Sequence, residues 1–154
     1  MNANELSHDL VRQAPVLRED DLVGDAVSAI LDSDLPALAV VARRQEFAGI
    51  FGEREFMAAL FPGYVGELRY AGFVKHGLDD AIERRVACRD DPVSRYMNTE
   101  HVAVEEDFSD VQIAETFLHH RVLIIPVVRQ RRVAGVITRA DFFRRIAERV
   151  LRTG

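Results

Sequence analysis

Apolar and polar positions follow each other along the chain in an order that occurs twice. Each copy has a short apolar stretch, an amphipathic helical segment, a continuous apolar run, a polar turn, a second apolar run and a final helical segment. Period-3.6 spacing predicts the helices, and the short apolar runs bounded by polar turns predict strands. The expected strands are 14–18, 35–41 and 47–51 in the first copy and 101–104, 122–128 and 133–137 in the second, with helices at 22–31 and 111–120.

The repeat is clearest where the last strand of each copy runs into a helix. Residues 48–57 read AGIFGEREFM, and residues 134–143, lying 86 positions later, read AGVITRADFF. Neither β-α-β-β-α unit has the means to cover both faces of so small a sheet, so the two are expected to pack together. We predict an α/β (α+β) fold of two pseudo-symmetric β-α-β-β-α repeats, one in residues 1–60 and one in residues 93–154.

Residues 61–92 separate the two repeats and are too long for a plain loop. A Pro-Gly turn opens this segment, after which residues 64–70 have a helical pattern that ends at Gly72. Residues 77–88 have apolar side chains at helical spacing and two aspartates in the first turn. The segment is therefore expected to be an extra helical connector.

Composition limits the classes of partner. The net charge of −5 argues against a nucleic-acid partner, whose phosphates need a basic surface. The longest apolar run, residues 122–128, is too short to span a membrane, and the first ten residues lack the apolar core of a signal peptide. A single cysteine, Cys88, is compatible with a reducing compartment. These features predict a cytoplasmic protein that binds neither membranes nor nucleic acid.

The sequence contains no motif for catalysis or metal binding. The five histidines have no spacing suited to a metal ligand set, since His119 and His120 are adjacent and point to different sides of a helix. No combination of nucleophile, base and orienting group is evident. We therefore expect no enzymatic activity, no metal and no permanently bound cofactor.

Thr138 and Asp141 form the one motif with chemical content, and it permits two interpretations. The pattern Thr-x-x-Asp at the start of a helix is a capping box, in which Thr138 accepts from the Asp141 amide and Asp141 reaches back to the Thr138 amide. Alternatively, a helix N-terminus attracts a phosphate, and a carboxylate one turn in accepts hydrogen bonds from two ribose hydroxyls. The residues alone leave both interpretations open.

The second copy, MNTEHVAVEEDFSDVQIAETFLHHRVLIIPVVRQRRVAGVITRADFF at residues 97–143, resembles the cystathionine-β-synthase (CBS) domain family. The first copy is similar but has Ala39 where Pro126 stands in the second, and it lacks the hydroxyl in its turn. The whole chain thus looks like a tandem CBS pair, or Bateman module. Such pairs commonly associate face to face, so the resemblance implies a homodimer.

The resemblance also implies a ligand site. Family members bind adenosyl compounds at positions matching Thr138 and Asp141, so AMP, ADP, ATP or S-adenosylmethionine is the expected ligand. The resemblance implies an apolar slot for the base between strand residues of the two halves. The expected site residues are Thr138, Asp141, Arg139, Ile124, Pro126, Val16 and Leu17.

The matching position in the first copy is expected to be a weak or vestigial site. Gly52 and Glu55 stand where the second copy has Thr138 and Asp141, so the hydroxyl is absent and the carboxylate is one methylene longer. Asn98 and Ala103 are expected to lie opposite them. Repeat symmetry thus preserves the helix in both copies, while the ligand chemistry is expected in one.

Two functions follow as hypotheses. The first is a non-catalytic regulatory sensor that binds an adenine-containing ligand between the repeats and acts on a protein partner that the sequence does not identify. The alternative is a structural module for dimerisation or protein interaction, whose ligand site is vestigial and whose Thr138 and Asp141 only cap a helix.

Overall fold

The computed structural model describes residues 6–62 and 77–154, and it confirms the predicted fold class. Within these residues each half is a β-α-β-β-α unit. The first half contains β1 (Leu17–Arg18), α1 (Val23–Ser33), β2 (Ala37–Val41), β3 (Phe47–Gly52) and α2 (Glu53–Leu60). The second contains β4 (Val104–Glu105), α5 (Asp110–His119), β5 (Ile124–Arg129), β6 (Arg132–Thr138) and α6 (Arg139–Arg152).

Between the halves lie α4 (Gly77–Arg85) and the 3-10 helices η2 (Val86–Asp90) and η3 (Val93–Arg95), and η1 (His8–Leu10) precedes β1. The helix expected at 77–88 is therefore α-helical as far as Arg85 and continues as η2. The helical pattern expected at 64–70 lies outside the described residues.

Each half folds around a three-stranded sheet with the same topology. The first two strands are parallel and the last two antiparallel, in the orders β1-β2-β3 and β4-β5-β6. The register is also equivalent, since Ala37 pairs with Gly52 in one sheet and Ile124 pairs with Thr138 in the other. The internal repeat thus extends from the sequence to the pairing of individual residues.

The first strand of each half is shorter than expected. The sequence predicted strands at 14–18 and 101–104, whereas β1 and β4 pair with their neighbours over two residues each. The chain segments that precede β1 and β4 pair instead with a strand of the other half. Arg12 exchanges two backbone hydrogen bonds of 2.8 and 2.9 Å with Val136 of β6, and Asn98 does the same with Ile50 of β3 at 2.8 and 2.9 Å.

Two glycines permit these crossings. A Cβ atom on Gly135 would lie 2.7 Å from the Arg12 carbonyl oxygen, and one on Gly49 would lie 2.7 Å from the Asn98 carbonyl oxygen. Only a residue without a side chain lets the crossing backbone come this close. The two halves are therefore joined by matched backbone contacts as well as by apolar packing.

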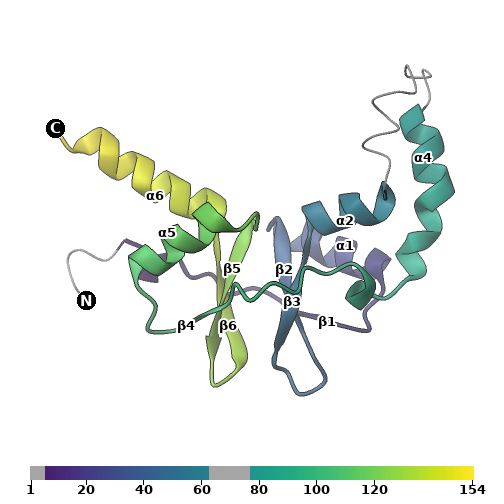
Figure 1. Cartoon of the computed structure of the whole chain (residues 1–154), viewed down its shortest axis with the longest axis horizontal. Helices are drawn as coiled ribbons and strands as arrows, with labels where there is room; N and C mark the ends of the chain where they lie inside the picture. Colours follow the sequence, from purple (N-terminus) through teal and green to yellow (C-terminus); the bar gives the residue numbers. More distant parts are fainter. Residues whose placement is uncertain (1–5, 63–76) are drawn as a thin grey trace.

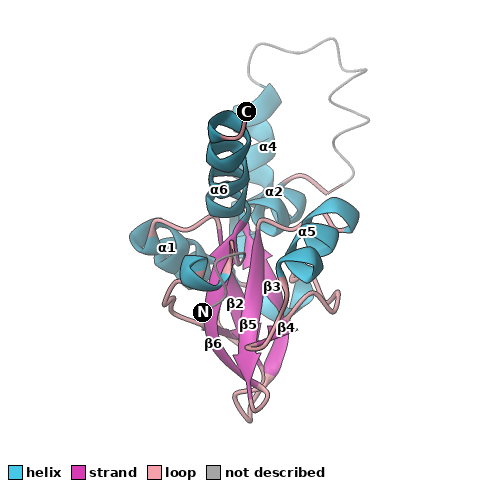
Figure 2. Cartoon of the chain, turned by 90° about the vertical axis from the view of Figure 1, so that its left-hand side faces the viewer, coloured by secondary structure: helices cyan, strands magenta, loops and turns pink. Residues whose placement is uncertain are grey.

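The strands of the two halves meet in the middle of the molecule, as Figure 1 shows. Figure 2 shows the helices gathered toward one end of the strands. One continuous core runs through both halves and includes Leu38, Val40, Phe51, Ile113, Ile125 and Ile137, all fully buried. In Figure 1, α2 and α6 both begin near the junction between the halves.

Candidate functional site

Thr138 caps α6 as the sequence predicted. The residue ends β6 in an extended conformation, its side chain is 4% exposed, and its Oγ1 accepts a hydrogen bond of 3.1 Å from the Asp141 amide. This bond satisfies one of the N–H groups that the first turn of a helix leaves without a backbone partner.

The Asp141 carboxylate does not return a bond to the Thr138 amide, so the reciprocal half of the predicted capping box is wrong. Asp141 instead binds Arg12 in a bidentate ion pair, with Nε–Oδ2 at 2.6 Å and Nη2–Oδ1 at 2.9 Å. Because the Arg12 backbone is fixed to Val136, its guanidinium is held close to the start of α6. Two charge-assisted hydrogen bonds from a guanidinium are stronger than one hydrogen bond from a neutral backbone amide. The Arg12 guanidinium is also the main reason that the pKa of Asp141 lies below its ordinary value.

In the first half the other bond of the capping box forms. The Gly52 amide donates to Glu55 Oε1 at 2.9 Å, and Gly52 has no side chain with which to cap the helix. The Glu55 side chain is partly buried, and burial raises its pKa. Each repeat thus forms one of the two hydrogen bonds of a capping box. Only in the second repeat does the carboxylate of the motif bind a residue outside the helix.

A groove of about 510 Å³ is lined almost wholly by the first half and reaches the second half at Ala140, the residue before Asp141. The Asp34 carboxylate lines this groove and helps raise the pKa of Arg12, which places it near the pair. The walls are mainly apolar. The lining residues are Val27, Ile30, Leu31, Asp34, Leu35, Pro36, Gly52, Glu53, Phe56 and Ala140.

The structure brings some of the expected site residues together and separates others. Ile124 and Pro126 are buried in β5, where they pair with Thr138 and Val136. Leu17 is buried in β1 and pairs with Val40, while Val16 is 38% exposed. None of these four residues lines the groove.

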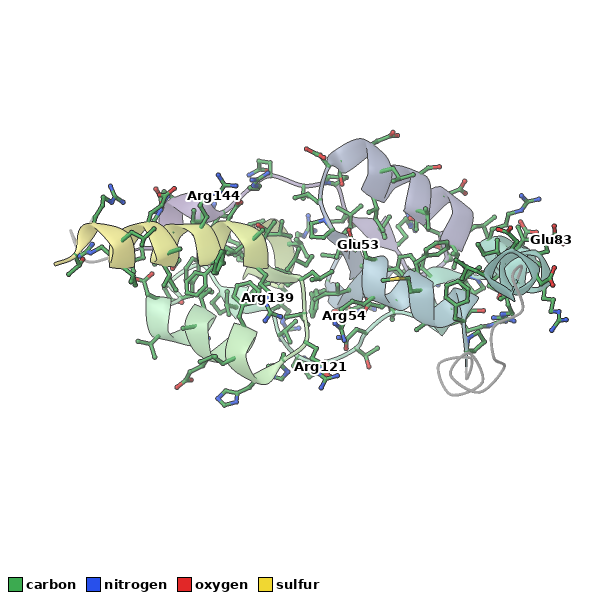
Figure 3. All side chains as sticks on the ribbon, turned by 90° about the horizontal axis from the view of Figure 1, so that it is seen from above. Glu53, Arg54, Glu83, Arg121, Arg139 and Arg144 are labelled. Atoms are coloured by element: carbon green, nitrogen blue, oxygen red, sulfur yellow. The ribbon has the colours of Figure 1, made fainter. Side chains whose placement is uncertain are left out.

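Gly52 lines the groove, whereas Arg139 does not. Seen from above in Figure 3, the Arg139 side chain lies near those of Arg54 and Arg121, whereas Glu53 faces the other side. Asn98 pairs with Ile50, two residues before Gly52. Ala103 is partly buried, next to β4.

Sequence reasoning missed Arg12, Asp34 and the Leu35–Pro36 step. The repeat contained the signal for Arg12. Asn98, expected opposite the first-half motif, lies 86 residues after Arg12, so the same shift that relates the two motifs also relates these two residues.

Residues 6–62 and 77–154 show no sign of two other kinds of site. These residues contain no group of three or more His, Cys, Asp or Glu side chains placed to hold a metal ion. None of the helices described is long and apolar enough to cross a membrane.

Comparison with known proteins agrees with this architecture. Residues 93–148 match the family model of the CBS domain. An uncharacterized protein of Methanocaldococcus jannaschii is 24% identical over 148 residues, which is 96% of this chain and 33% of that protein. The chain thus spans about a third of the length of the curated relative that it matches.

Two solved structures have the same fold over nearly the whole chain. A CBS-domain containing protein from Agrobacterium tumefaciens has a TM-score of 0.68 at 19% identity, covering 95% of this chain and 98% of that one. The protein CBSX2, solved in complex with AMP, has a TM-score of 0.65 at 16% identity, covering 97% of this chain and 100% of that one. At these identities the similarity establishes the fold.

Proposed function

Because the chain contains a CBS domain at residues 93–148 and has the fold of a CBS pair throughout, we propose that it is a regulatory, non-catalytic module that binds an adenosyl compound between its two halves. The ligand site that we propose is centred on Thr138 and Asp141. AMP, ADP, ATP and S-adenosylmethionine are the candidate ligands. Ligand binding would alter the surface that the module, acting as a homodimer, offers to a partner protein in the cytoplasm.

The observation that carries this proposal is that the Asp141 carboxylate accepts its hydrogen bonds from Arg12 and none from the backbone of its own helix. It lies in the first turn of α6, next to Ala140, which lines a mainly apolar groove, and its partner is a guanidinium from the other half of the chain. Two ribose hydroxyls can donate to a carboxylate in the same bidentate manner as the two N–H groups of Arg12. The groove walls at Leu35 and Pro36 would offer apolar surface to a purine.

The AMP complex of CBSX2 supports an adenosyl ligand for a chain of this fold. Thr138 would act beside Asp141, because its hydroxyl already lies at the helix N-terminus, where an anion is favoured. A ligand of this kind would regulate by binding the two halves in one arrangement more tightly than in another.

A second candidate function is favoured by the same ion pair. If Arg12 holds Asp141 permanently, the pair joins the two halves and the module is structural, serving dimerisation or protein interaction with a vestigial ligand site. The two functions differ in whether a ribose can replace Arg12 at Asp141.

Thermal unfolding of the whole chain against AMP, ADP, ATP, S-adenosylmethionine and NAD tests the proposal. A ligand that binds only the folded state stabilises it by RT ln(1 + [L]/Kd), about 2.7 kcal/mol at a hundredfold excess over Kd. We expect one adenosyl compound to raise the melting temperature of the wild type, and Asp141→Asn to abolish that rise. Glu55→Gln, at the equivalent position of the other half, is the matched control and should keep it. No rise with any of the five compounds would favour the structural module.

A further inference from the structure

Residues 6–12, the segment that precedes β1, are attached to helix α5 of the second half. The carboxylate of Asp110, in the first turn of α5, accepts hydrogen bonds from the Leu6 amide at 2.7 Å and from the Ser7 amide at 3.0 Å. The Ser7 hydroxyl donates to the same carboxylate, and Ser7 is fully buried. The beginning of the segment is therefore fixed to the start of α5.

Helix α6 holds the same segment at two further points. Arg145 donates to the Leu6 carbonyl at 2.9 Å and forms an ion pair with Asp9, with 2.8 Å between Nη1 and Oδ1. Asp141, four residues before Arg145, forms the bidentate pair with Arg12. Side chains four residues apart lie on the same face of a helix. One face of α6 therefore binds both ends of the segment.

Apolar contacts attach the middle of the segment. The His8 ring stacks on Phe108, with 4.1 Å between the ring centroids and 5° between the ring planes. Leu10 and Val11 are partly buried against the common core. Figure 1 shows the segment, in purple, beside the second half before the chain crosses to β1. Residues 6–12 thus form a strap that is attached at its start, middle and end.

The attachment at the end of the strap coincides with the proposed ligand site. In the proposed function a ribose takes the place of the Arg12 guanidinium, whose two N–H groups bind both oxygens of the Asp141 carboxylate. The bonds that Asp110 and Arg145 make to the strap do not involve this carboxylate. A ligand at Asp141 would therefore leave the strap in place but hold it more weakly.

We propose that the strap is the element through which the module responds to its ligand. An adenosyl ligand at Asp141 displaces Arg12 and loosens residues 6–12, and an attached strap opposes ligand binding. This inference rests on the proposed function and adds to it the segment that changes. Because coupling between two equilibria is reciprocal, any change that loosens the strap elsewhere also strengthens ligand binding.

Hydrogen exchange of the whole chain, followed by mass spectrometry with and without adenosine, tests the direct effect. With saturating adenosine, residues 6–12 should exchange about two- to fivefold faster, which is the effect of losing one partly exposed ion pair. Ligand binding ordinarily stabilises the folded state, so the expected direction is the opposite of the usual one. Strand β2 is the internal reference and should exchange at the same rate or more slowly.

Isothermal titration of the same samples with adenosine separates two kinds of failure. Absence of adenosine binding would refute the adenosyl function and the role of the strap together. Adenosine binding with unchanged or slower exchange of residues 6–12 would leave the adenosyl function intact and overturn the role of the strap alone.

Asp110→Asn tests the reciprocal effect from the far end of the strap. The variant removes the charge that holds Leu6 and Ser7, so it should bind adenosine about twofold more tightly than the wild type. The gain should disappear in an Arg12→Ala background, because the strap then no longer reaches Asp141.

Glu115→Gln is the matched control for Asp110→Asn, because it removes an exposed carboxylate from the same helix. It should bind adenosine like the wild type. No gain in affinity with Asp110→Asn, a gain that persists in Arg12→Ala, or an equal gain with Glu115→Gln would each overturn the coupling.

Discussion

Arg12 and Asp141, 129 residues apart in the chain, form a bidentate ion pair that joins the segment before β1 to the last helix of the second repeat. The Arg12 side chain is 51% exposed and that of Asp141 is 21% exposed. Solvent therefore screens the pair, and its value for stability is small. In the proposed function the pair matters more, because a ligand would have to replace Arg12 at the Asp141 carboxylate.

A double-mutant cycle measures the pair directly. Arg12→Ala, Asp141→Asn and the double variant should give a coupling energy of about 0.5–1 kcal/mol in chemical denaturation, the range of partly exposed ion pairs. The coupling should fall at high salt. A coupling energy near zero would mean that the crossing of Arg12 is held by its backbone bonds to Val136 alone.

The same substitution tests competition between Arg12 and a ligand. If ribose hydroxyls replace Arg12 at Asp141, Arg12→Ala should bind adenosine about two- to fivefold more tightly than the wild type, since the ligand no longer breaks the pair. Adenosine is the suitable probe, because it carries no charge that Arg12 itself would attract. Arg18→Ala, an exposed arginine on β1, serves as the control and should bind like the wild type. Weaker binding by Arg12→Ala would show that Arg12 supports the ligand and does not compete with it.

Acid should release the N-terminal segment, residues 6–12, from the second half. Three carboxylates hold this segment, and the pKa of each lies below its ordinary value. Arg145 lowers the pKa of Asp9, and Arg12 lowers the pKa of Asp141. At Asp110 burial raises the pKa, but hydrogen bonds from Ser7 and from the Leu6 amide outweigh it and lower the pKa overall. A depressed pKa contributes stability above the unfolded value, about 3.9, and the contribution disappears as the pH falls through the folded value.

Hydrogen exchange followed by mass spectrometry checks this expectation. Between pH 5 and pH 3, after correction for the intrinsic rate, protection of residues 6–12 should fall more than protection of β2. In Asp110→Asn, protection of this segment should already be reduced at pH 5, and the further loss on acidification should be smaller. Equal loss of protection in the segment and in β2 would indicate global unfolding and contradict the prediction.

The sequence predicted the parts of this structure that local pattern controls. The apolar runs gave β2, β3, β5 and β6 to within two residues at each end, and the Thr138 cap followed from its place before an amphipathic helix. The part that failed is the destination of the Asp141 carboxylate. Local pattern favours a bond to the nearest amide, whereas the fold brings a guanidinium from 129 residues away.

The segments around Arg12 and Asn98, which pair with the opposite half, also have no periodic pattern in the sequence. Arg12 and Asn98 each pair with a single residue of the opposite half, which is too little to produce alternation. Subtracting the repeat shift of 86 residues from the predicted site residue Asn98 would have pointed to Arg12.

Glu55 should make the protein less stable as the pH rises. Burial raises its pKa, so the unfolded chain, with a value of about 4.3, loses the proton before the folded one does. Stability from this group therefore falls between the unfolded and the folded pKa. Glu55→Gln keeps an oxygen to accept from the Gly52 amide and removes the charge. We expect it to match the wild type near pH 4 and to exceed it at pH 7 in urea unfolding; a less stable variant at pH 7 would contradict this.

Restoring the hydroxyl in the first repeat should destabilise the protein, although it would complete a capping box with Glu55. A Cβ atom on Gly52 would lie 2.3 Å from the Ala37 Cβ and 2.5 Å from the Pro36 carbonyl oxygen. Both are backbone or first side-chain atoms that cannot turn away. Gly52→Ser should therefore cost about 1–3 kcal/mol through overpacking, which exceeds the gain from a cap of about 1 kcal/mol.

The second repeat provides the comparison. Thr138→Ala should lose about 1 kcal/mol, because the Asp141 amide loses its acceptor, while Thr138→Ser should be close to the wild type. Urea unfolding of the three variants checks the set. A Gly52→Ser variant more stable than the wild type would mean that β2 moves away at Ala37. Close packing at Gly52 would then not explain why the first repeat lacks the hydroxyl. Loss of stability in both Gly52→Ser and Thr138→Ala would show that two equivalent positions of one repeat have opposite requirements, set by the neighbouring strand.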